Sequence, residues 1–269
     1  TSGGSIKVAG ATGKVKADTS GGSIKIGPTT KKVVVNTSGG SIKIEEAQGD
    51  IKADTSGGAI NVVGTSGSVD IDTSGGNLFV GKSGEFVKAE TSGGNITIKQ
   101  ANGYIEADTS GGRIEAEMIQ TDNSKDTHIS LDSSGGSITL YIPKSIEASV
   151  SAKLNISRNS YKDYRIYSDF PLTIKGEDSS RISAKGKING GGDKIDISTS
   201  NGDIYITFSE GVDEEEQAIV LDEFNLELDD RRHSNKVRAT VTSESMNPIK
   251  VAYVLEKWSL VETAYADMD

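Results

Sequence analysis

Residues 37–54 read TSGGSIKIEEAQGDIKAD, and the block that follows them, 55–72, reads TSGGAINVVGTSGSVDID. In both directions from here the Thr-Ser-Gly-Gly motif recurs at one constant interval, beginning at residues 1, 19, 37, 55, 73, 91 and 109. A strict period of this length is typical of proteins built from one structural unit stacked on the next. We number the positions of each repeat from 1 to 18, starting at its Thr.

Each repeat contains two alternating patterns. Positions 6 and 8 are apolar, as are positions 15 and 17, with polar residues between them; Ile42, Ile44, Ile51 and Ala53 are an example. This spacing indicates two short, half-buried strands per repeat. Stacked repeats of this kind form two parallel sheets with inner faces about 10 Å apart. The sequence therefore predicts an all-β fold, a β-solenoid of stacked 18-residue two-strand coils (a flattened β-helix or β-roll).

The turns of such a narrow coil have to be tight. We expect the Gly pair of each motif to reverse the chain with a positive φ at one residue or more. The Ser and Thr hydroxyls of the motif are expected to bond the turn backbone.

Departures from the period divide the chain into three parts. Residues 1–143 are predicted to form regular coils, with six extra residues inserted before the motif that begins at Ser133. Residues 144–208 are predicted to form longer, irregular coils of the same solenoid, and residues 209–269 an acidic segment followed by a C-terminal β-rich cap. Strands are expected at Glu147–Ile156, Tyr164–Tyr167, Lys194–Ser198, Lys236–Ser243 and Ile249–Trp258.

Composition excludes several classes of function. The net charge of −10 arises from the acidic residues of segment 210–230, so the rest of the chain is neutral and lacks the basic surface that nucleic-acid binding requires. The chain has no Cys, which excludes disulfides, thiol catalysis and Cys-based metal sites. No apolar run is long enough for a membrane span, and no signal peptide is visible. The chain begins inside a motif, so we expect further residues upstream.

Several landmarks outside the repeat accompany the motif. They are Tyr141-Ile142-Pro143-Lys144, Ser168-Asp169-Phe170-Pro171-Leu172, and Gly190-Gly191-Gly192 followed by Thr199-Ser200-Asn201-Gly202-Asp203. Together with the Asp-Thr-Ser-Gly-Gly-x-Ile repeats they resemble the bacterial adhesin-like family of β-strand-repeat proteins, a domain of unknown function. The resemblance covers residues 1 to about 208. It implies a β-solenoid in an extracellular, cell-surface or periplasmic bacterial protein, and it brings no catalytic residues.

Position 18 forms a row of acids if the repeats stack. Its members are Asp18, Asn36, Asp54, Asp72, Glu90, Asp108 and Asp132. Our first interpretation is that these side chains cap the turns, with Lys16, Lys52 and Lys88 supplying counter-charge. Calcium binding is a second interpretation, although calcium-binding β-rolls carry Asp inside a different turn motif. A third is a glycan hydrolase, because neighbouring acids in the row approach the separation used by retaining glycosidases.

Position 14 forms the most unusual row. It runs Lys14, Lys32, Asp50, Ser68, Phe86, Tyr104, and then His128 if the insertion closes back onto the stack. Outward aromatic residues on neighbouring coils are atypical for a chain with only 5% aromatic residues. One hypothesis makes Phe86, Tyr104 and His128 a platform that binds sugar rings. The alternative is that the insertion, the terminal module or another subunit covers them.

These observations favour a non-enzymatic protein that binds a partner or serves as a structural scaffold. We expect no catalytic residue, no metal ligand and no cofactor; the lysines at position 7 (Lys7, Lys25 and Lys43) defend a sheet against edge association. The expected partner is a glycan or an extracellular or envelope protein. Two alternatives stay open: a carbohydrate-active enzyme on a β-helix, and a periplasmic scaffold or sensor that contacts a partner protein through its acidic segment. The sequence does not indicate an oligomeric state.

Overall fold

The computed structural model describes residues 1–119, 125–157, 160, 163–177 and 179–209. The chain divides into two compact units, Thr1–Gly211 and Val212–Asp269, and the second lies wholly outside the described residues. The same holds for the strands predicted at Lys236–Ser243 and Ile249–Trp258 and for the predicted C-terminal cap. Over the described residues the first unit is all-β, without any helix.

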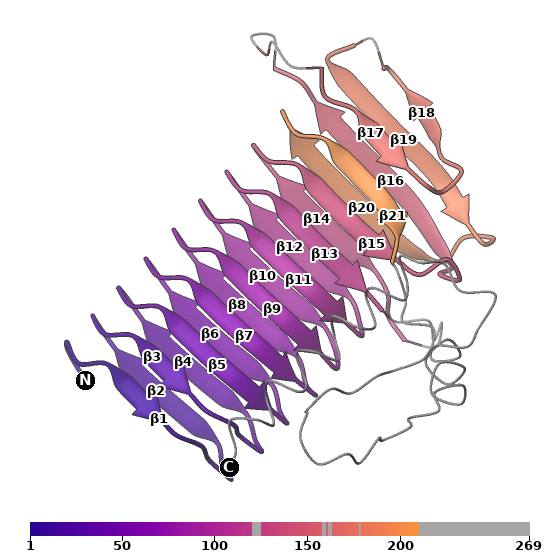
Figure 1. Cartoon of the computed structure of the whole chain (residues 1–269). Coiled ribbons are helices and arrows are strands. Elements are labelled where there is room, and N and C mark those ends of the chain that lie inside the picture. Colours follow the sequence, from indigo (N-terminus) through magenta and orange to yellow (C-terminus); the bar gives the residue numbers. More distant parts are fainter. Residues whose placement is uncertain (120–124, 158–159, 161–162, 178, 210–269) are drawn as a thin grey trace, which may run out of the picture. The chain divides into compact units, whose positions relative to one another are not determined.

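The strands of the first unit form two long sheets (Figure 1). Sheet A has ten strands, in the spatial order β1 (Ile6–Val8), β3 (Ile24–Ile26), β5 (Ile42–Ala47), β7 (Ile60–Thr65), β9 (Leu78–Ser83), β11 (Ile96–Ala101), β13 (Ile114–Met118), β15 (Ile138–Ile142), β21 (Ile204–Phe208) and β17 (Ile166–Ser168). Sheet B has eleven, in the order β2 (Val15–Thr19), β4 (Val33–Thr37), β6 (Ile51–Thr55), β8 (Val69–Thr73), β10 (Val87–Thr91), β12 (Ile105–Thr109), β14 (Ile129–Ser133), β20 (Asp193–Ser200), β16 (Ala148–Asn155), β19 (Arg181–Ile188) and β18 (Thr173–Lys175).

The repeat period sets the strand register. In sheet A, Ile42 pairs with Ile60, and in sheet B, Ile51 pairs with Val69; both pairings are parallel. The apolar residues of positions 6, 8, 15 and 17 point inward and, apart from Ile6 and Val8 of the first repeat, are buried. The long parallel sheets and the two alternating strands per repeat that the sequence predicts are therefore confirmed.

The repeat glycines have a different role from the one expected. Among the described glycines a positive φ occurs only at Gly176, Gly190 and Gly191, so the prediction for the Thr-Ser-Gly-Gly turns is wrong. Instead, successive turns lie in close contact. A Cβ placed on Gly58, at position 4, would lie 2.1 Å from the carbonyl oxygen of Gly40 in the preceding repeat. Position 4 therefore excludes any side chain because of its neighbour, not because of its own dihedral angles.

The Thr at position 1 connects each turn to the one before it. The Thr55 hydroxyl donates a hydrogen bond to the carbonyl of Gly40 at 2.9 Å and accepts one from the amide of Gly58 at 3.4 Å. Ser133, which replaces the Thr after the insertion, makes the same pair of bonds. The expected bonding of motif hydroxyls to the turn backbone is therefore confirmed for the hydroxyl at position 1, which either Thr or Ser can supply.

Beyond β15 the order in space differs from the order in the chain. Strand β20 pairs directly with β14, with Ile129 opposite Ile195, and β21 pairs with β15 in the same way. Residues 193–208 thus continue the regular stack, while β16 lies on the far side of β20 and β17 on the far side of β21 (Figure 1). Strand β19 then pairs antiparallel with β16, and β18 with β19. The described end of sheet B is therefore formed by β16, β19 and β18.

Candidate functional site

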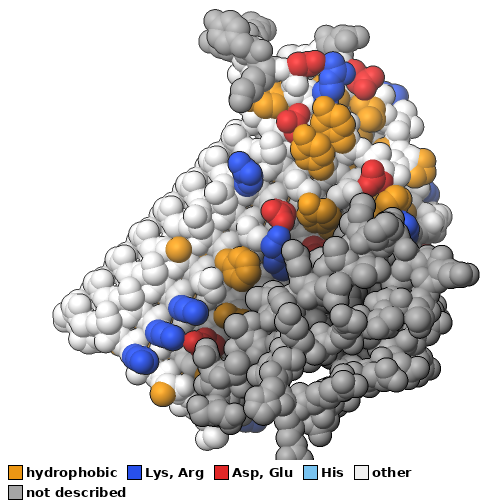
Figure 2. Space-filling view, viewed as in Figure 1, with side chains coloured by type: hydrophobic (Ala, Val, Ile, Leu, Met, Phe, Trp, Pro, Cys, Tyr) orange, Lys and Arg blue, Asp and Glu red, His pale blue; other side chains and the backbone are white. Residues whose placement is uncertain are grey.

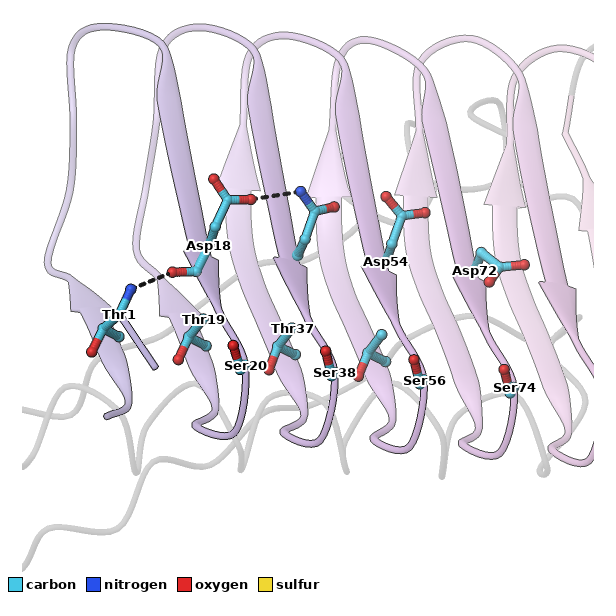
Figure 3. A pocket seen from close by; sticks show the side chains of 12 residues that line it. Thr1, Asp18, Thr19, Ser20, Thr37, Ser38, Asp54, Ser56, Asp72 and Ser74 are labelled. Carbon is cyan, nitrogen blue, oxygen red and sulfur yellow. Dashed lines mark hydrogen bonds between the residues drawn. The ribbon is translucent and has the colours of Figure 1, made fainter. Parts of the chain in front are cut away.

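The acidic row of position 18 runs along the outer face of sheet B. Its first members, with the adjacent turn residues, line a shallow groove of about 360 Å³ (Figure 3). Asn36 Nδ2 donates to Asp18 Oδ1 at 2.7 Å, which relieves the repulsion at that step. In the described repeats, Thr hydroxyls accept the hydrogen bonds from the Gly amides of the turns. The interpretation of this row as turn caps is therefore wrong, because the Thr at the next position already fills that role.

Burial and like charges act on the carboxyls of this row. Burial raises the pKa of Asp54; Lys52 opposes that effect, while Asp70 and Asp72 add to it. Burial and the neighbouring Asp132 raise the pKa of Asp108 in the same direction.

The lysines pair within their own row rather than with position 18. Lys52 Nζ lies 2.6 Å from Asp70, and Lys88 Nζ lies 2.8 Å from Glu106, each one repeat further along. The carboxyls at position 18 thus interact with these lysines only at longer range. Among the described residues no group of three or more His, Asp or Glu side chains is arranged to hold a metal ion.

The position-14 row brings Phe86, Tyr104 and His128 together. The ring centres of Phe86 and Tyr104 are 4.7 Å apart with planes 6° from parallel, and those of Tyr104 and His128 are 4.4 Å apart at 16°. His128 aligns with this row as expected, because the amide of Ile105 donates to its carbonyl in the way that Val87 donates to Tyr104. Tyr104 is sandwiched, so neither face of its ring is open to a ligand.

Charged groups surround the His128 end of this stack. Nδ1 of the imidazole lies 2.7 Å from Asp126, and Nε2 lies 3.3 Å from Glu106, which also binds Lys88. Burial alone would lower the pKa of His128, but the hydrogen bonds to Asp126 and Glu106 raise it above its ordinary value. Asp126 and Glu106 therefore favour the protonated form of the partly buried imidazole.

Other residues of the position-14 row also interact with the equivalent residue of the next repeat. Lys32 lies 3.8 Å from Asp50, and the Ser68 hydroxyl donates to Asp50 at 2.9 Å. Four adjacent pairs of the row thus match in chemistry, Lys32–Asp50, Asp50–Ser68, Phe86–Tyr104 and Tyr104–His128, whereas Lys14–Lys32 and Ser68–Phe86 do not. This pattern fits a role in holding neighbouring repeats in register.

A second aromatic group was not anticipated from the sequence. Tyr167 of β17 stacks on Tyr205 of β21, with ring centres 4.9 Å apart and planes 9° from parallel. Both tyrosines, with Tyr141 of β15, border a groove of about 460 Å³ on the outer face of sheet A. Tyr205 could have been suspected, since it occupies position 7 of the motif that begins at Thr199. No local pattern marks Tyr167 as its neighbour.

Comparison of the chain with protein-family models, with curated proteins and with solved structures finds no match. The described residues contain no helix with the length and apolarity needed to cross a membrane.

Proposed function

We propose that the chain is a β-solenoid of stacked 18-residue coils, from the bacterial adhesin-like repeat family, and that it acts outside the cytoplasm as a non-enzymatic binding scaffold. The in-register pairing of equivalent residues in successive repeats supports the coil, because strands of the two sheets alternate along residues 1–143. The predicted C-terminal cap, residues 209–269, is part of this proposal.

One observation carries the binding role: the interior of the repeats is fully used for packing, and the outer faces hold long ordered rows. In the described residues no buried side-chain nitrogen or oxygen lacks a hydrogen-bond partner. The distinctive chemistry therefore lies on the outside, in parallel rows spaced by the strand separation of about 4.8 Å. Rows of this kind suit an extended partner that crosses several coils, such as a glycan or an extracellular or envelope protein.

The Phe86–Tyr104–His128 row is one candidate contact surface within this proposal. Because the rings stack on each other, a ligand would meet their edges together with the charges of Lys88 and Glu106. Such a surface favours a polar partner over the face-on stacking of a sugar ring.

The binding role is tested with the intact chain in a screen against immobilised glycans and extracellular-matrix proteins. We expect saturable capture of at least one of them. Absence of capture across both panels would contradict the binding role. An export signal encoded upstream, or recovery of the protein from the cell-surface fraction, would support the proposed location, and retention in the cytoplasm would contradict it.

A carbohydrate-active enzyme is the second candidate, and one observation favours it. Burial raises the pKa of Asp54, and Asp72 lies on the adjacent strand, so a carboxyl with a raised pKa next to a second carboxyl would match the two-acid arrangement of a glycosidase. Release of reducing ends from a panel of polysaccharides, lost in both Asp54→Asn and Asp72→Asn, would establish this alternative in place of the scaffold.

A further inference from the structure

The groove on sheet A lies at the end of the stack where the regular repeats stop. Tyr141, Tyr167 and Tyr205 border it, and Thr139, Asp169 and Thr207 supply its polar atoms. We call this set the tyrosine groove. Figure 2 shows hydrophobic side chains gathered on this part of the face, where β15, β21 and β17 lie, whereas lysines follow one another at the opposite end.

The two stacked tyrosines are unusually exposed. Tyr167 is 47% exposed and Tyr205 is 39% exposed, and among the described residues Val63 is the only other large apolar side chain classed as exposed. Two adjacent exposed rings bordering one groove indicate a surface that contacts a ligand.

One face of the Tyr205 ring borders open space. In the register of sheet A, Tyr205 lies between Tyr167 and Thr139. Tyr167 covers one face of the ring. On the other side the register places Thr139, whose side chain is much smaller than an aromatic ring, and Thr139 and Tyr205 both line the groove. Tyr104 differs in this respect, because Phe86 and His128 cover both of its faces.

The polar atoms of the groove are held in place. Asp169 accepts hydrogen bonds from the Thr207 hydroxyl and from the Phe208 amide, both through Oδ2. Its Oδ1 atom has no partner among the described residues and can accept a hydrogen bond from a ligand. The lining residues include an acid and no Lys or Arg, which disfavours an anionic ligand.

We propose that the tyrosine groove binds a neutral pyranose ring of a glycan, with the C–H face of the sugar on the open face of Tyr205. A sugar ring has an apolar face and a rim of hydroxyls, which match the negative face of an aromatic ring flanked by acceptors. An apolar peptide side chain would leave Asp169 and the Thr hydroxyls without new partners. This inference rests on the proposed binding role and specifies its ligand class and contact site.

The test measures binding of the intact chain to glucose, galactose, mannose and N-acetylglucosamine and to their linear trimers, by saturation-transfer NMR and calorimetry. We expect at least one of these sugars to bind. Tyr205→Ala should weaken that binding about ten-fold, and Tyr205→Phe should preserve it, because the ring face is what the sugar contacts. Phe79→Ala is the matched control, since Phe79 occupies the same row on β9 but lies outside the groove, and it should bind as the wild type does.

A second variant fills the open space without removing a contact. Thr139→Tyr should place a third ring on Tyr205 at the strand spacing, extending the stack and abolishing sugar binding while the fold is retained. Unchanged binding in both Tyr205→Ala and Thr139→Tyr would overturn the inference. If the wild type captures a matrix protein but none of the sugars, the binding role stands and the sugar inference fails. If it captures neither, the binding role itself fails.

Discussion

The regular repeats, residues 1–143, and the end region, residues 144–208, use the same two sheets in different ways. In the repeats each strand pairs with its equivalent in the next repeat, and neighbours in space are neighbours in sequence order. In the end region, β20 pairs with β14 and β21 pairs with β15. The strands that come between β15 and β20 in the chain, β16 to β19, lie beyond β20 and β21 in the two sheets. The regular stack is thus extended by pairing between repeats that are adjacent in sequence, whereas the end of the stack requires pairing between strands far apart in the chain.

Backbone chemistry differs between the two regions as well. The repeats place glycine where successive turns touch, and their φ angles stay negative or extended. The end region places Gly176, Gly190 and Gly191 at positive φ, together with Asn189 and Asn201. Among the described residues, a neighbouring backbone requires glycine at position 4 of the repeats and again at Gly202, where the returning chain rejoins the stack, whereas a positive φ occurs only in the end region.

The largest expected effect comes from replacing one glycine of each region with alanine, which tests this contrast. Gly58→Ala should destabilise the protein by about 3 kcal/mol, at the upper end for overpacking, because its Cβ would meet backbone atoms of the preceding turn 2.1 Å away. Gly190→Ala should cost about 1 kcal/mol, because φ is +93° there and no atom lies within 4 Å of the added Cβ. Urea unfolding followed by circular dichroism measures both losses.

Substitution with asparagine distinguishes a clash with the preceding turn from strain at a positive φ. Asn accepts positive φ, so Gly190→Asn should recover stability relative to Gly190→Ala, while Gly58→Asn should be no better than Gly58→Ala. Gly57→Ala is the control within the motif, because its nearest contact would be an ordinary 3.7 Å. Equal losses for Gly57→Ala and Gly58→Ala would show that the turns do not stack as described.

The next effect concerns the hydroxyl that links one turn to the next, which both regions share. Thr55→Val should cost about 1–3 kcal/mol, because the Gly40 carbonyl and the Gly58 amide would lose their buried partner. Thr199→Val should cost a similar amount, since Thr199 donates to Gly136 across the return of β20. The measurement is again the shift of the urea midpoint.

Serine is the matched replacement at both sites, and Ser133 already shows that it suffices. Thr55→Ser and Thr199→Ser should therefore lose much less than the Val variants. If Thr199→Val were neutral while Thr55→Val was costly, the returning strand would not be held by the same turn bond as the repeats.

Prediction from sequence succeeded where contacts follow the period. The register of Phe86, Tyr104 and His128 could be inferred across the insertion, because each residue precedes an inward Val or Ile by one place. The tyrosine groove could not be inferred, because Tyr167 meets Tyr205 only after the chain leaves the stack and returns. The φ of the motif glycines was misjudged because the residue that excludes a side chain lies in the preceding repeat, outside any local turn rule.

The smallest effect is a pH dependence within the regular repeats, just before β14, where the stack resumes after the insertion. The folded pKa of His128 is raised above its ordinary value of 6.5, so its contribution to stability is complete below pH 6.5 and is lost as the pH rises through the folded pKa. The pKa values of Glu106, through Lys88 and His128, and of Asp126, through His128, are lowered, so their contributions are lost in acid, below their ordinary values of 4.5 and 3.8. Stability from this cluster should peak between those limits, with an amplitude below about 1 kcal/mol.

Titration of the imidazole signals of His128 measures its pKa directly. The chain has only two His residues, and His233→Gln identifies the signals of the other. His128→Gln should remove the loss above pH 6.5 but keep most of the acid loss, because Glu106 retains Lys88 as its main partner. A His128 pKa at or below 6.5 would mean that burial outweighs Asp126 and Glu106, and that the segment after the insertion is not tied to the stack by this charge pair. The repeats before the insertion, which pair Lys52 with Asp70 and have no His, should show no such dependence near neutral pH.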